Sequence, residues 1–159
     1  MEIRVYPDPV LRKRADEIQE IDGEVKKLAE QMIPIMYENY GVGLAAPQVG
    51  ESVRLITVDV SETRDTPQVF VNPEIVEAKG RIKGEEGCLS IPGINADVER
   101  PKFVVLQAMN LEGEKLELEA SGLFARVLSH EIDHLNGILF VDKVSPAKKI
   151  AIAKILKER

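Results

Sequence analysis

The sequence contains only two histidines, His130 and His134, and their spacing constrains the fold more than any other feature. Residues four positions apart on an α-helix project from one face about a turn apart, so both imidazoles can reach a single metal ion. Residues 123–136 have the apolar spacing of a helix, and Leu123 and Val127 lie on the histidine stripe. A solvated helix face with two histidines is the alternative. Because buried histidines need polar partners, we expect the chain to fold around this helix.

A catalytic metal site needs a third protein ligand and an open position. Glu131, beside the first histidine, can reach a water on the ion without being a ligand. Metalloproteases with this helix pattern usually take their third ligand downstream, where the only acids here are Asp142, after the strand-like run 138–141, and Glu158. Neither position suits a ligand. We therefore expect the third ligand to lie upstream of the histidines.

The only cysteine, Cys88, lies in the segment Glu86-Gly-Cys-Leu-Ser90. A thiolate is a strong ligand for soft or borderline metal ions, and Gly87 lets the backbone pass close to whatever the sulfur binds. A lone cysteine is more often a small buried apolar residue. The missing third ligand favours the metal-binding interpretation.

A third segment, residues 41–50, is rich in glycine and other small residues. Such a backbone is open to hydrogen bonding with an extended ligand. A phosphate-binding loop is the obvious rival, but the segment lacks the Lys-Ser/Thr pair that such a loop needs. A helix end at Gly41, followed by a turn and a strand, is the plain structural alternative.

Composition predicts one soluble domain over residues 1–159: the chain is 44% hydrophobic and 30% charged. It has no signal-peptide pattern and no apolar run near the roughly 18 residues of a membrane span, which predicts a cytoplasmic protein with no membrane partner. The net charge is −6, yet from Lys143 onward six basic residues face the single acid Glu158, a local charge of +5. A basic tail on an acidic body can contact nucleic acid locally.

Local patterns predict an α+β fold with largely antiparallel β-sheets packed around a central metal-binding helix, plus an N-terminal and a C-terminal helix. The expected helices begin after Asp22, with a kink or an end at Pro34, and after Ser145, with Pro146 in the first turn. The expected strands cover 54–60, 69–71 and 75–77, and a hairpin joins 102–109 to 115–120.

Together the stretches GVGLAAPQ (41–48), EGCLS (86–90) and HEIDHL (130–135) resemble, in order and spacing, the three signature stretches of the peptide deformylase family. The similarity extends along the chain and includes residues 8–11. Members of this family remove the N-formyl group from the initiator formyl-methionine of new polypeptides and release formate. A two-histidine zinc protease, or a non-catalytic metal-binding module, is the alternative.

The resemblance implies that one divalent metal ion is bound by Cys88, His130 and His134. The expected ion is Fe(II) in cells, with Zn(II), Ni(II) or Co(II) also compatible with these ligands. Glu131 is then the general base and acid. The side-chain amide of Gln48 and the backbone N–H of Leu89 are the expected hydrogen-bond donors to the formyl oxygen.

The resemblance also implies that the substrates are N-formyl-Met nascent peptides, bound as an added strand along residues 41–43. The expected substrate-binding residues are Val42, Gly43, Gly87, Leu123 and Val127. The basic C-terminal helix is expected to dock the enzyme on the ribosome, through rRNA or protein near the peptide exit.

Overall fold

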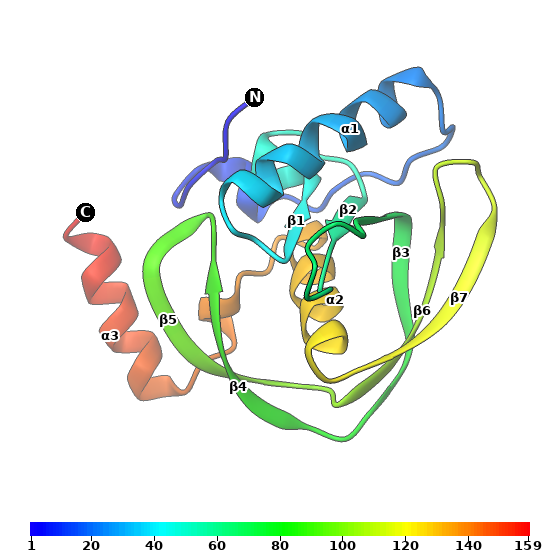
Figure 1. The fold of residues 1–159 in the computed structure, drawn as a ribbon. Helices are drawn as coiled ribbons and strands as arrows, with labels where there is room; N and C mark the ends of the chain where they lie inside the picture. Colours follow the sequence, from blue (N-terminus) through cyan, green and yellow to red (C-terminus); the bar gives the residue numbers. More distant parts are fainter.

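The computed structural model describes residues 1–159, and its strands and helices surround helix α2 (Gly122–Leu135), as Figure 1 shows. A five-stranded sheet has the order β1-β2-β3-β6-β7, and β4 and β5 form a separate hairpin. All of these pairs are antiparallel, which confirms the predicted α+β fold. The other helices and strands are α1 (Gly23–Glu38), β1 (Gly43–Ala45), β2 (Leu55–Val58), β3 (Gln68–Lys79), β4 (Ile82–Cys88), β5 (Ile91–Arg100), β6 (Phe103–Met109), β7 (Lys115–Ser121) and α3 (Pro146–Lys157), with short 3-10 helices at Pro9–Arg12, Ala46–Val49 and Phe140–Asp142.

Helix α2 is buried on two faces, which explains its central position. One face packs into the core of the five-stranded sheet through Ala125, Leu128, Ile132 and Leu135. The other face carries both histidines and Glu131, all of them buried. A helix with polar side chains on a buried face requires partners from the rest of the chain, and strands β1, β4 and β5 supply them.

The two predicted terminal helices are present. Asp22 caps α1 by accepting a hydrogen bond from the Val25 N–H at 3.1 Å, and the Ser145 hydroxyl caps α3. Helix α1 continues past Pro34 to Glu38, so of the two outcomes expected at that proline, a kink or an end, the end is wrong. The buried face of α1, with Met32 and Met36, extends across the proline and holds the last turn against the core. No helix combines the length and the hydrophobicity needed to cross a membrane.

The strand predictions were right in kind and incomplete in extent. The hairpin of β6 and β7 is confirmed, and the strand expected over 54–60 is the shorter β2. The two short strands expected at 69–71 and 75–77 are one strand, β3, because a register shift between Val71 and Glu74 absorbs the irregular Asn72-Pro73. Asn72 has a φ of 50°, and its side chain bonds both backbone groups of Ile18.

Three local features differ from expectation. The hairpin of β4 and β5 has no predicted counterpart, because its glycines and charged residues obscure the alternation of a strand. The strand-like run 138–141 leads into a 3-10 helix at Phe140–Asp142. At the end of α1 the left-handed residue is Tyr40, with φ 59°, and not Gly41.

Candidate metal centre and active site

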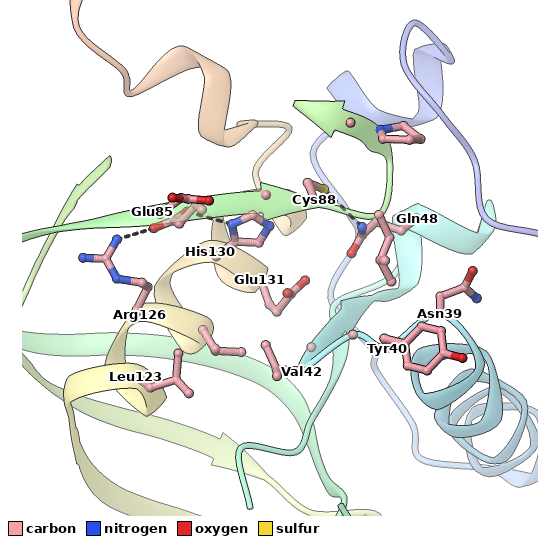
Figure 2. Close-up of a pocket in the computed structure, with 18 residues that line it drawn as sticks. Asn39, Tyr40, Val42, Gln48, Glu85, Cys88, Leu123, Arg126, His130 and Glu131 are labelled. Carbon is pink, nitrogen blue, oxygen red and sulfur yellow. Dashed lines mark hydrogen bonds and ion pairs between the residues drawn. The ribbon is translucent and has the colours of Figure 1, made fainter. Parts of the chain in front are cut away.

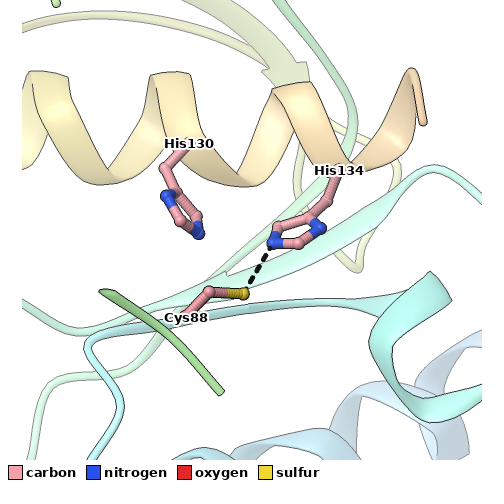
Figure 3. Close-up of side chains that lie close together, drawn as sticks. All are labelled: Cys88, His130 and His134. Atoms are coloured by element: carbon pink, nitrogen blue, oxygen red, sulfur yellow. Dashed lines mark hydrogen bonds between the residues drawn. The ribbon is translucent and has the colours of Figure 1, made fainter. Parts of the chain in front are cut away.

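Three potential metal ligands converge between α2 and the end of β4 (Figure 3). The sulfur of Cys88 and one ring nitrogen from each of His130 and His134 all lie within 4.8 Å of one another. The Cys88 Sγ is 3.2 Å from the His134 Nε2. Ligand bonds of about 2.3 Å to sulfur and 2.1 Å to nitrogen allow such atoms to share one ion.

The hydrogen bonding and charge around these side chains fit a divalent cation. The His130 Nδ1 lies 2.9 Å from the Glu86 carboxylate, which leaves its Nε2 for an ion. Burial alone would lower the pKa of His130, but Cys88, Glu86 and Glu131 raise it to about 10, so a positive charge is favoured here. A bound cation supplies that charge and displaces the proton. Burial lowers the pKa of His134 well below its usual value and keeps this ligand neutral.

A buried ion-pair network orients His130 from behind. The carboxylate of Glu86 accepts two hydrogen bonds of 2.9 Å from Arg100 and one of 2.6 Å from Arg126. Arg100 is 2% exposed and also donates to Asp133 at 2.6 Å. Burial opposes the ionised form of Glu86, but Arg100 and His130 outweigh it and lower the pKa to about 2. Glu86 therefore carries a negative charge against the His130 ring.

The carboxyl group of Glu131 projects toward the site from the turn of α2 between the histidines (Figure 2). The residue is 4% exposed, and its Oε1 has no hydrogen-bond partner in the protein. Burial raises its pKa to about 7. A carboxyl group that titrates near neutral pH can both accept and deliver a proton.

Two further groups expected at the site lie beside the sulfur. The amide Nε2 of Gln48 is 3.5 Å from the Cys88 Sγ and 3.2 Å from the Ser90 hydroxyl. The Oε1 of Gln48 accepts from the Ala45 N–H at 2.9 Å, so the amide donor faces the site. The backbone N–H of Leu89 has no hydrogen-bond partner within the protein. The Gln48 amide is therefore oriented toward a ligand, and the Leu89 N–H is free to donate to one.

These side chains form the inner end of a cavity of about 510 Å³ (Figure 2). All five expected substrate-binding residues line it, as do Gln48, Cys88, Leu89, His130 and Glu131; His134 is buried behind them. Leu123 is 55% exposed and Val42 is 37% exposed, so the apolar part of the cavity faces solvent. Arg126 also lines the cavity, and its guanidinium lies 2.9 Å from the position that a Cβ on Gly84 would occupy.

Strand β1 presents a free edge to this cavity. The Val42 carbonyl accepts from the Asp59 N–H at 2.9 Å, whereas the Asp59 carbonyl accepts from Arg64 and not from the Val42 N–H. Bonded and non-bonded pairs alternate, so the next pair, Gly43 with Val58, directs the Gly43 N–H and C=O away from β2. The N–H of Ala45, two residues further along β1, also points away from β2, because it donates to the side chain of Gln48. An extended peptide can pair with this edge.

The residues that support His130 were only partly identifiable from sequence. Glu86 lies in the motif around Cys88 but has no predicted role, and Arg100 lies outside all three motifs. The available sequence signal for this support was an acidic residue, Glu86, two positions before Cys88. The downstream acid that a protease would need is not at the site: Asp142 is paired with Arg12 at 2.6 Å, and the ligand group contains only the cysteine and the two histidines.

A three-ligand metal group with a buried carboxyl group, at the end of an open cavity in an α+β fold, defines a metal-dependent hydrolase. A family model described as polypeptide deformylase matches residues 1–150. The chain belongs to the polypeptide deformylase family, whose members are metal-dependent and act on formylated nascent peptides.

Relatives and solved structures agree with this assignment. The chain is 48% identical to the peptide deformylase of Thermodesulfovibrio yellowstonii, over 100% of this chain and 98% of the relative. A crystal structure of the Thermotoga maritima enzyme is similar with a TM-score of 0.87 and 48% identity, covering 91% of this chain and 97% of that one. The Synechococcus elongatus enzyme, solved in complex with actinonin, has a TM-score of 0.93 and 41% identity, covering 99% and 88%.

Proposed function

We propose that this protein removes the formyl group from N-formyl-Met nascent peptides in the cytoplasm. The observation that carries the proposal is the buried carboxyl group of Glu131 beside the group formed by Cys88, His130 and His134, at the end of a cavity with a free strand edge. Hydrolysis adds water across the formyl C–N bond and yields formate and a free amine.

The proposed ligands of the divalent ion are Cys88, His130 and His134. When bound, the ion supplies Lewis acidity and promotes the ionisation of water. We propose Fe(II) as the ion in cells, because the family resemblance implies it, while thiolate and imidazole ligands also suit Zn(II), Ni(II) and Co(II). Activity that is lost in air, together with oxidation of the Cys88 sulfur or release of metal, supports iron. Activity that is indifferent to air contradicts it.

In the proposed mechanism Glu131 accepts the proton of the attacking water and delivers it to the departing amine nitrogen. Negative charge develops on the formyl oxygen as its carbon becomes tetrahedral. The Gln48 amide and the Leu89 N–H donate to that oxygen, and neither donor titrates near neutral pH. Because Gln48 is already held by the Ala45 N–H, its donor needs little reorientation.

The proposed substrate lies along the free edge of β1 and forms backbone hydrogen bonds with Gly43. Such bonds bind a peptide largely independently of its side chains. The methionine side chain enters the apolar part of the cavity at Val42, Leu123 and Val127. Burial of the exposed Val42 and Leu123 side chains against a flexible thioether favours binding. Gly87 also lines the cavity, and a Cβ there would clash with the side chain of Asn95, so this part of the wall is bare backbone.

Formate release from a formyl-Met peptide tests this function, after metal content has been measured for each sample. We expect Glu131→Gln to lower kcat by about 10²- to 10⁴-fold at equal metal content, because the amide keeps the shape but cannot accept the proton. Glu99→Gln, an exposed acid on β5, is the matched control. No formate release by the metal-loaded wild type, or an unaffected Glu131→Gln, contradicts the proposal.

A second proposal concerns the ribosome. Helix α3 packs through Ile152, which is buried, and leaves Lys148, Lys149, Lys154 and Lys157 exposed. This basic surface suits rRNA, whose phosphates attract lysines. Changing the four lysines to glutamate should abolish salt-sensitive binding to ribosomes in a sedimentation assay, with hydrolysis of a short formyl-peptide retained. Removal of α3 after Val144 tests the same point, and unchanged ribosome binding by both variants refutes it.

A further inference from the structure

The loop between β2 and β3 holds the backbone of Gly41 and Val42, two residues of the cavity wall. The guanidinium of Arg64 donates to the Asp59 carbonyl at 2.6 Å and to the Gly41 carbonyl. The Asp59 N–H donates to the Val42 carbonyl at 2.9 Å. Two successive carbonyls of the cavity wall are therefore tied to one loop.

Arg64 is itself held in place on several sides. Its Cζ lies 5.3 Å from the centroid of the Tyr37 ring, and the Tyr37 hydroxyl donates to the Asp59 carboxylate at 2.5 Å. That carboxylate, on a residue 1% exposed, also accepts from the N–H and hydroxyl of Ser61 and from the Thr66 N–H. The loop is thus organised around one buried, hydrogen-bonded acid.

The backbone of Arg64 is in the left-handed region, with φ 57°. A non-glycine residue adopts this conformation at a cost, which persists only where the surrounding contacts determine it. Here the determining contacts are the guanidinium bonds and the bond from the Arg64 N–H to the Ser61 hydroxyl at 3.1 Å. A strained backbone whose side chain reaches a cavity wall indicates a positioning role.

The bond to Gly41 has a direct consequence for the next peptide group. The Gly41–Val42 peptide is trans, so the Val42 N–H points opposite to the Gly41 carbonyl and therefore away from Arg64. This N–H has no hydrogen-bond partner in the protein, and Val42 lines the cavity. Gly41 has no side chain to hold this peptide plane. It cannot readily be replaced by a larger residue, because a Cβ there would lie 2.9 Å from the Leu89 Cδ1.

We propose that Arg64 is a positioning residue for peptide binding: by holding the Gly41 carbonyl, it orients the Val42 N–H and the free edge of β1 toward the substrate backbone. The proposal rests on the proposed deformylase function for its substrate. Arg64 touches no reacting atom, so its role lies in binding the peptide and not in the chemical step.

The test compares Arg64→Ala, Arg64→Lys and Tyr37→Phe with Arg81→Ala, an exposed arginine in the turn between β3 and β4. For metal-loaded Arg64→Ala we expect the KM for formyl-Met-Ala-Ser to rise about 5- to 30-fold, the effect of one or two lost hydrogen bonds, with kcat within about twofold. Arg64→Lys should give a smaller rise, because an ammonium cannot bridge two carbonyls as a guanidinium does. Tyr37→Phe should also give a smaller rise, and Arg81→Ala should give none.

A ligand without a peptide backbone separates positioning from general damage to the site. Acetohydroxamate can bind the metal but has no peptide to pair with β1, so its inhibition constant should not change in Arg64→Ala. The inhibition constant of the product Met-Ala-Ser should rise in step with the KM. Equal weakening of both inhibitors, a fall in kcat without a change in KM, or unchanged constants all overturn the proposal. Urea unfolding identifies any variant that fails to fold, in which case Arg64→Lys and Tyr37→Phe decide the question.

Hydrogen exchange measured without substrate keeps this proposal distinct from the proposed function. Loss of the Arg64 bond should accelerate amide exchange in residues 41–45 of Arg64→Ala, with exchange in α2 unchanged. If the wild type released no formate, the proposed function would fail while this exchange result could still stand. Unchanged exchange in an active enzyme overturns the role of Arg64 alone.

Discussion

Replacing Glu86 with glutamine should separate the support of the metal centre from its ligands. The change keeps the size of the side chain but removes the charge that faces Arg100, Arg126 and His130. The glutamine amide has one acceptor and one donor group, so at least one of these three donors faces another donor. Arg100 then remains buried with only Asp133 as a charged partner.

The magnitude follows from the burial of these charges. Breaking a buried ion pair by removing one partner costs about 3–5 kcal/mol. Because Arg100 keeps Asp133 and Arg126 keeps the carbonyls of Ile82 and Val98, we expect the lower end, about 3 kcal/mol. With an m-value of about 2 kcal/mol/M, the urea midpoint should fall by about 1.5 M. The loss of the acceptor for His130 should weaken metal binding about 10- to 100-fold.

The urea midpoint should be measured on metal-free protein, and metal affinity by competition with a coloured chelator. Glu99→Gln, which removes an exposed acid 3.6 Å from Arg81, should change the unfolding free energy by less than about 0.5 kcal/mol. If Glu86→Gln matches the wild type in both the midpoint and the metal affinity, the network does not support His130 and the reasoning fails.

Three further changes test other parts of the structure. In Gly43→Ala the new Cβ would lie 2.6 Å from the Glu131 Oε2, so kcat/KM for a formyl-peptide should fall about 100-fold, whereas Gly23→Ala, with nothing within 4 Å, should have no effect. Burial by itself would raise the pKa of Asp59, but its hydrogen bonds have the larger effect and lower the pKa to about 2. The stability that the ionised Asp59 contributes is therefore present above the unfolded pKa of about 4 and is lost as pH falls toward 2. Asp59→Asn should therefore reduce the drop in urea midpoint between pH 5 and pH 2.5, and an equal drop in both proteins contradicts this assignment. Leu128→Ala, at a fully buried position, should lower the unfolding free energy by about 2–5 kcal/mol in urea, and a loss under about 1 kcal/mol would mean that the site is not tightly packed.

Some of the fold was predictable because its signals are local. The caps at Asp22 and Ser145 and the alternation in β6 and β7 depend on neighbouring residues, and each predicted element is present. The sequence left open whether α1 ends at Pro34 or continues through a kink, and packing of Met36 against the core, which outweighs the missing hydrogen bond at the proline, decides for continuation. The joining of two short segments into β3 depends in the same way on pairing with β6, which is distant in sequence.

The sequence by itself determined which residues are candidates for the site: the two imidazoles one helical turn apart converge because of their helical spacing, and a neighbouring carboxyl group and one thiol complete the candidate group. Only the tertiary structure decided how that chemistry is supported. Glu86 and His130, 44 positions apart in the sequence, are joined by a hydrogen bond, and Arg64 bonds Gly41 across 23 positions. Such contacts depend on the packing of separate strands and loops, and no local pattern in the chain encodes them.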